Sequence, residues 1–137
     1  NEESEYIKKF AKDRKLKIYS IGGAQSCADK FIDCSPFEVL AYFKNAELVV
    51  TDTFHGSIFS VITKRNFVTL VRKSVGNNYG NEEKLTDLLK RLSLENRITY
   101  DVRNIDTILE NKINYVQVDN ILKAERINTL KYLEKEV

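Results

Sequence analysis

The sequence predicts an α/β domain of the three-layer, Rossmann-like type with a mostly parallel sheet. Short apolar runs typical of buried strands alternate with segments whose apolar residues recur at helical spacing. Strands that alternate with helices form parallel sheets with helices on both faces. The length suits one domain, so we interpret residues 1–137 as a single unit. The strands are expected at residues 16–21, 31–34, 47–51, 67–71 and 98–102.

Helices are predicted between and after these strands. Ser35-Pro36 is the strongest helix start, with serine as the N-cap and proline at the first helical position. Glu38 lies three residues after Ser35, as in a capping box. The charges of the last helix are expected to face solvent. The other helices are expected over residues 3–14, after residue 53, from Glu82, over residues 104–111 and over residues 118–136.

Composition excludes several classes of protein. Hydrophobic residues make up 42% of the chain and charged residues 31%, as in ordinary globular proteins. The net charge of +2 is too small to indicate a nucleic-acid partner. No apolar run approaches the ~18 residues that a membrane span needs. The acidic N-terminus lacks the pattern of a signal peptide, and the chain contains no methionine, so we expect it to be part of a longer protein.

The cysteines, Cys27 and Cys34, have neither CxxC spacing nor metal-site partners. We interpret them as reduced thiols of a cytoplasmic protein. A disulfide between them is the lesser alternative, and a position at the inner face of the membrane is compatible with the same composition.

The candidate site lies where a strand meets a helix. Residues 48–50 are apolar and strand-like, and helical spacing begins after residue 57, so His55, the single histidine, falls between the two. Ligands bind at this edge of open α/β sheets. A helix N-terminus there supplies free N–H groups and partial positive charge for phosphate or carboxylate. Thr53 and Ser57 offer hydroxyls as N-cap or ligand donors, and Gly56 lets a ligand approach the backbone.

A structural interpretation of the same residues is equally compatible with the pattern. A single histidine in a strand–helix turn is often a turn or capping residue, and Asp52 alone is more often a cap than a catalyst. Gly22-Gly23 also favours a turn, because neither a GxGxxG nor a Walker pattern is present.

Two further features are expected near this edge. Arg72 and Lys73 directly follow the strand at 67–71, which makes them candidate anion-binding residues. Residues 74–81 are rich in glycine and asparagine and form the most loop-like stretch of the chain. Such a loop either closes over a substrate or is an ordinary surface loop.

Several stretches resemble the C-terminal half of the polysaccharide pyruvyl transferase family, and the resemblance covers about residues 16–100. The characteristic core is the segment TD-S/T-FHG-S/T-xFS, which here runs from Thr51 to Ser60. The matching stretches read SPFEVL at residues 35–40, NAELVVTDTFHGSIFS at 45–60, FV at 67–68 and LLKRLSLENR at 88–97.

This resemblance implies an enzyme with two Rossmann-like domains in a glycosyltransferase-B-like arrangement, of which this chain is the C-terminal half. Family members transfer a pyruvyl group from phosphoenolpyruvate to sugar hydroxyls, usually as a cyclic ketal on a bacterial cell-surface polysaccharide. No metal or other cofactor is implied. The partners implied are phosphoenolpyruvate, a saccharide acceptor and the N-terminal domain, and we expect the isolated half to be inactive.

The resemblance also implies roles for individual residues. His55 matches the motif histidine and is expected to act as acid or base, or to orient the donor. Thr53, Gly56 and Ser57 are expected to hold the phosphate. Some members carry an arginine two residues before the histidine, where this chain has Thr53. The positive charge must then come from the missing half or from Arg72, Lys73 and Lys84.

Two other functions remain open. One is the donor-binding domain of a nucleotide-sugar glycosyltransferase, which the absence of a glycine-rich nucleotide loop disfavours. The other is a non-catalytic Rossmann-like interaction module. Burial of His55 inside the core, with hydrogen bonds there and no cleft above it, would support that interpretation.

Overall fold

The structure, a computed structural model, describes residues 2–21, 27–33, 35–72 and 81–136; side chains are described as far as residue 125, except at positions 36 and 81. Gly22-Gly23, Cys34, Lys73 and nearly all of the loop expected at 74–81 therefore lie outside the described residues. In chain order the elements are α1 (Glu2–Asp13), β1 (Tyr19–Ile21), β2 (Lys30–Ile32), α2 (Pro36–Asn45), β3 (Leu48–Thr51), α3 (Phe54–Ile62), β4 (Asn66–Leu70), α4 (Asn81–Arg91), η1 (Glu95–Arg97), β5 (Ile98–Thr99), η2 (Val102–Asn104), α5 (Ile105–Glu110) and α6 (Tyr115–Glu136).

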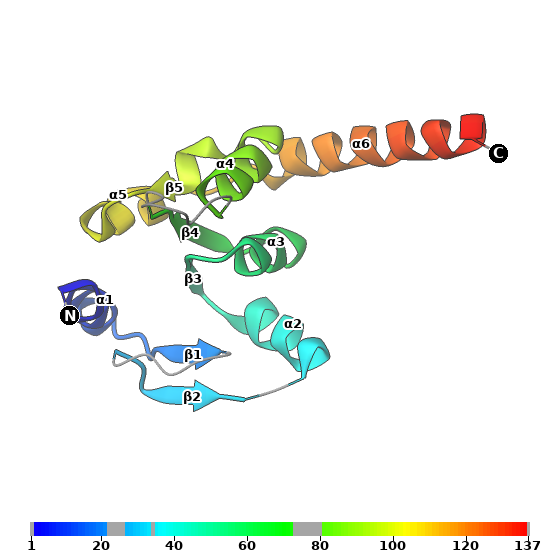
Figure 1. Cartoon of the computed structure of the whole chain (residues 1–137). Coiled ribbons are helices and arrows are strands. Elements are labelled where there is room, and N and C mark those ends of the chain that lie inside the picture. The colour runs from blue at the N-terminus through cyan, green and yellow to red at the C-terminus, as the bar shows by residue number, and fades with distance from the viewer. Residues whose placement is uncertain (1, 22–26, 34, 73–80, 137) are drawn as a thin grey trace.

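The α/β class is confirmed, and all strand pairs in the described part of the chain are parallel (Figure 1). The expectation that five strands share one sheet is wrong for these residues. β1 pairs with β2, and β3, β4 and β5 form a separate sheet in that order. Strand periodicity indicates which faces are buried but not which strand lies alongside, so the sequence pattern could not separate the two sheets.

The larger sheet has a helical layer on each face. Side chains of β4 alternate between two apolar clusters, with Phe67 on one side and Val68 and Leu70 on the other. Phe67 packs with residues of α3, α4 and α6, whereas Val68 and Leu70 pack with α1 and α5. A three-layer arrangement is therefore present around β3–β4–β5.

The capping signals of the sequence are confirmed in α2. Ser35 is the N-cap, and its hydroxyl accepts a hydrogen bond from the Glu38 backbone N–H at 3.4 Å. The same hydroxyl donates to the Glu38 carboxylate at 3.0 Å. The predicted helix start is local in sequence, and both partners lie within one helical turn.

The strand expected at residues 98–102 is shorter than predicted. β5 ends at Thr99, because Asp101 takes part in a turn. The Asp101 backbone N–H donates to Thr99 Oγ1 at 3.1 Å, and its carboxylate accepts from the Arg103 N–H at 2.9 Å. This side-chain contact begins η2 and ends the strand.

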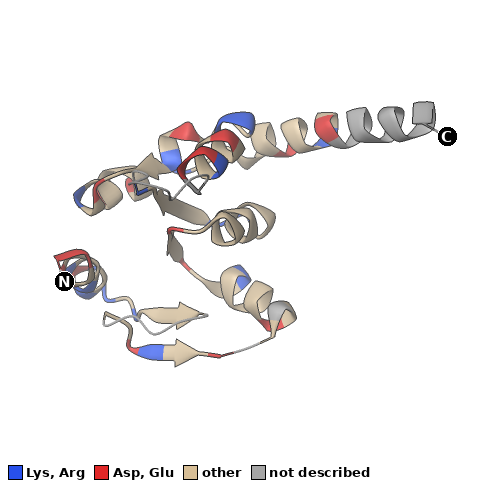
Figure 2. Ribbon diagram, in the orientation of Figure 1, with Lys and Arg blue, Asp and Glu red and all other residues tan. Residues whose placement is uncertain are grey.

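α6 begins three residues before the predicted start and extends away from the sheet (Figure 1). Its first turns are anchored by the buried Val118. Figure 2 shows charges of both signs on α1 and α4, whereas α3 carries none. Within the described residues, no helix is long and apolar enough to cross a membrane.

Candidate functional site

The N-terminus of α3 is built by two threonines. Thr53 is the N-cap, and its hydroxyl accepts a hydrogen bond from the Gly56 N–H at 2.9 Å. The Thr53 N–H in turn donates to Thr51 Oγ1 at 3.2 Å. The N–H groups of Phe54 and His55 belong to the first turn, which a helix cannot satisfy internally. These two N–H groups, together with the partial positive charge of the helix N-terminus, favour an anion at this turn.

Gly56 is explained by the space around it. A β-carbon at this position would overlap Thr51 Oγ1 and would lie 2.8 Å from Thr53 Oγ1. The protein's own threonines therefore occupy the space that we assigned to a ligand, and they are a sufficient reason for glycine here. A ligand contact of Gly56 stays a prediction.

Ser57 lies inside the fold with a side chain that is 0% exposed. Its hydroxyl donates to the Thr53 carbonyl at 2.9 Å and shares a hydrogen bond of the same length with Thr69 Oγ1 of β4. These contacts lock α3 onto the sheet directly behind the Thr53 cap. They give Ser57 a structural role, and its role in holding phosphate stays a prediction.

His55 is exposed at the start of α3. Its ring lies between Phe54 and Phe59, with ring centroids 6.0 Å and 6.4 Å away. Neither aromatic ring can accept an imidazole N–H hydrogen bond as a carbonyl or carboxylate would, and the His55 side chain is exposed, so a ligand can approach it. The burial of His55 that would have supported a non-catalytic interaction module is not found.

Arg72 follows β4 and joins three elements. Its guanidinium makes two hydrogen bonds to the Glu3 carboxylate of α1, at 2.7 Å and 2.8 Å. It also lies 3.5 Å from Asp52, which follows β3. The hydrogen bonds from Arg72 lower the pKa of Glu3, and the two carboxylates raise the pKa of Arg72. The expected cation is thus at this edge of the sheet, but its charge is already paired.

Residues 2–74, just over half of the chain, match the family model for polysaccharide pyruvyl transferase. This chain belongs to the polysaccharide pyruvyl transferase family. The match includes the α3 turn with His55 and reaches from Glu3 to Arg72, so both partners of the ion pair lie inside it. Neither a curated protein nor a solved structure matches the chain.

The roles of the other two cations, Lys73 and Lys84, stay predictions. Lys73 lies outside the described residues. Lys84 is exposed in the first half of α4. Its contact with an anion stays a prediction. In the part of the chain that the structure describes, no group of three or more histidine, cysteine or acidic side chains is placed to hold a metal ion.

Two residues with unexpected environments were missed by the sequence analysis. Glu3 reaches Arg72 across 69 positions of the sequence, and no local pattern marks such a pair. Arg97 is 0% exposed and donates to the carbonyls of Phe67 at 2.8 Å and Asn111 at 2.6 Å, and to the Asn66 side chain. Burial lowers the pKa of Arg97. In sequence it resembles any surface arginine.

Two cavities in the structure are lined by residues away from His55. One, of about 350 Å³, opens near the start of β3; the other, of about 500 Å³, lies beside β1 and β2. The first cavity is lined by Arg14, Leu16, Glu47, Leu48, Leu109 and Glu110, and the second by Lys17, Tyr19, Asp29 and Lys30.

Proposed function

We propose that this chain is the C-terminal domain of an enzyme that transfers a pyruvyl group from phosphoenolpyruvate to sugar hydroxyls of a bacterial cell-surface polysaccharide. The observation that carries the proposal is the exposed His55 at the N-terminus of α3, inside the segment that matches the family. The proposed donor site is this turn, with Arg72 beside it.

The chemistry of the donor suits the turn. Phosphoenolpyruvate carries a phosphate and a carboxylate, and both are bound best by oriented N–H groups and cations. The free N–H groups of Phe54 and His55 supply the first kind of donor. Arg72 supplies the second, on the neighbouring strand end.

At each stage of the reaction a sugar hydroxyl loses a proton, and a group of the donor gains one. The first sugar oxygen bonds to the central carbon of the donor, and its proton is balanced by protonation of the methylene carbon. The second sugar oxygen then displaces phosphate, which leaves with the second proton. His55 is our candidate for the group that moves these protons, because its imidazole is exposed and unoccupied by described hydrogen-bond partners.

The proposal includes a second domain that covers the α3 turn. His55 is exposed on this chain, whereas catalysis of this kind requires that water be kept from the activated donor. We propose that an N-terminal Rossmann-like domain covers the turn and completes a cleft, so that this chain alone is inactive.

The test is a transfer assay on the full-length protein with phosphoenolpyruvate and candidate saccharides. We expect phosphate release together with a ketal methyl signal on the saccharide by NMR, and loss of both in His55→Ala. Lys64→Gln is the control, because Lys64 lies beyond the far end of α3 and forms only an exposed ion pair with Asp119 at 3.0 Å. A His55→Ala enzyme with the wild-type rate would refute the role of His55. A failure of the wild type to modify any saccharide would refute the function.

A further inference from the structure

We infer that Glu3 is an internal competitor for the anion site at Arg72, so that binding of an anionic donor replaces the Glu3–Arg72 pair. The inference rests on the proposed function for the identity of the donor. It assigns to α1 a role in setting anion affinity.

The first argument is the geometry of the pair. Glu3 meets the guanidinium with both carboxylate oxygens, at 2.7 Å and 2.8 Å. This parallel pairing is the arrangement by which arginine recognises carboxylates and phosphates in ligands. Glu3 therefore fills the guanidinium face that a substrate carboxylate or phosphate would use.

The second argument is position. Asp52 lies directly before the Thr53 cap of α3, and Arg72 reaches it at 3.5 Å. The guanidinium is thereby held at the turn that carries His55. Its side chain is 59% exposed, so a ligand can approach it from solvent.

The third argument is charge. One guanidinium faces two carboxylates, so the group of Glu3, Asp52 and Arg72 is negative in total and repels an anion as it stands. One carboxylate must leave before an anion is held. Glu3 is the carboxylate that must leave, because it covers the guanidinium with both oxygens, at 2.7 Å and 2.8 Å, whereas Asp52 makes one contact at 3.5 Å. Glu3 extends from the first turn of α1, whereas Asp52 belongs to the short β3–α3 turn.

The fourth argument is that α1 does not depend on this contact. The buried Phe10 and Ala11 anchor the helix to the sheet. Tyr6 adds hydrogen bonds of 3.2 Å to the Arg103 carbonyl and to Asp106. Glu3 can therefore release Arg72 while α1 stays in place.

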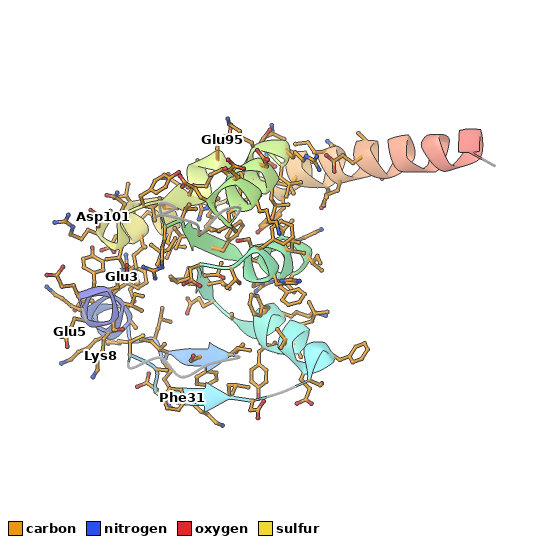
Figure 3. The ribbon with its side chains drawn as sticks, viewed as in Figure 1. Glu3, Glu5, Lys8, Phe31, Glu95 and Asp101 are labelled. Carbon is orange, nitrogen blue, oxygen red and sulfur yellow. The ribbon has the colours of Figure 1, made fainter. Side chains whose placement is uncertain are left out.

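The chain offers a matched control on the same helix. Glu5 is an exposed glutamate two positions away from Glu3. Figure 3 shows Glu5 and Lys8 on a different side of α1 from Glu3. Glu3→Gln and Glu5→Gln thus change net charge equally, and only the first frees Arg72.

The experiment is an NMR or calorimetric titration of the chain with inorganic phosphate, pyruvate and phosphoenolpyruvate. We expect Glu3→Gln to tighten binding of these anions roughly two- to fivefold, the range set by an exposed ion pair. Glu5→Gln should bind like the wild type. Arg72→Gln should bind more weakly and should abolish the gain from Glu3→Gln in the double variant.

Three outcomes would overturn the inference. Equal gains in Glu3→Gln and Glu5→Gln would show an effect of net charge alone. Weaker binding in Glu3→Gln would make Glu3 a positioning residue for Arg72. Binding that depends on neither residue would place the anion elsewhere. Thermal unfolding of each variant confirms that the compared proteins are folded.

The inference and the proposed function fail in different ways. If the full-length protein transfers the pyruvyl group but anion binding is unchanged in both Arg72→Gln and Glu3→Gln, the function stands and the inference falls. If phosphate binds more tightly to Glu3→Gln and more weakly to Arg72→Gln, while the full-length protein transfers no pyruvyl group, the inference stands and the function falls.

Discussion

Thr51 packs against Gly56 at the junction of β3 and α3 and fills the space that a side chain on residue 56 would need. A β-carbon on residue 56 would overlap the hydroxyl oxygen of Thr51 and would lie 3.0 Å from the Thr51 β-carbon. The last residue of the strand thus packs directly against the first turn of the helix. This contact fixes where the helix begins and therefore where His55 is presented.

Gly56→Ala should destabilise the fold by about 1–3 kcal/mol, the usual cost of overpacking a tight site. The added methyl group must displace Thr51 or Thr53, and Thr53 then loses its cap geometry. Denaturant unfolding of the variant measures the loss. The double variant with Thr51→Ala should recover part of it, because the overlapping hydroxyl is gone. A single variant as stable as the wild type would show that the junction is not tightly packed.

Thr53→Val should lower the free energy of unfolding by about 1 kcal/mol, because it removes an N-cap acceptor and leaves the Gly56 N–H unpaired. Thr53→Ser keeps the hydroxyl and should retain most of the stability. Chemical denaturation of both variants tests the cap. A Thr53→Val variant as stable as the wild type would contradict the capping role of the hydroxyl.

Arg97→Met should destabilise the fold on the order of 3 kcal/mol. The substitution leaves the Phe67 and Asn111 carbonyls and the Asn66 side chain without their donor in a buried place. Arg91→Met, on the exposed end of α4, is the matched control and should change stability little. Thermal unfolding measures the difference, and equal melting temperatures of the two variants would contradict this account of Arg97.

The Glu3–Arg72 pair should stabilise the fold in a pH-dependent way. Arg72 lowers the pKa of the Glu3 carboxyl below its ordinary value of 4.5. The contribution is therefore fully present above pH 4.5 and is lost as pH falls through the lowered value. Because the pair is partly exposed, the difference in unfolding free energy between wild type and Glu3→Gln should be at most about 1 kcal/mol. In an Arg72→Gln background the difference should no longer depend on pH in this range.

Local signals in the sequence were reliable because their partners lie within one helical turn. The N-caps at Ser35 and Thr53 are of this kind, and both are confirmed. The apolar run at residues 67–71 correctly predicted a strand, which the structure has as β4. The motif around His55 is also continuous in sequence, and it placed the chain in its family.

Features that depend on distant parts of the chain could not be predicted in this way. The separation of β1–β2 from β3–β4–β5 depends on which strand edges meet. The Glu3–Arg72 pair depends on where α1 packs. The burial of Ser57 depends on Thr69, so a hydroxyl that looked available for a ligand is used inside the fold.

The central claim is that the α3 turn holds the donor through His55. The most direct measurement is a titration of this chain with phosphoenolpyruvate, followed by backbone amide shifts, in the wild type and in His55→Ala. We predict shifts centred on Phe54 and His55 in the wild type, and binding that is roughly tenfold or more weaker in the variant, as for loss of a hydrogen bond to a charged group. Shifts located elsewhere, or equal affinity in the two proteins, would contradict the claim.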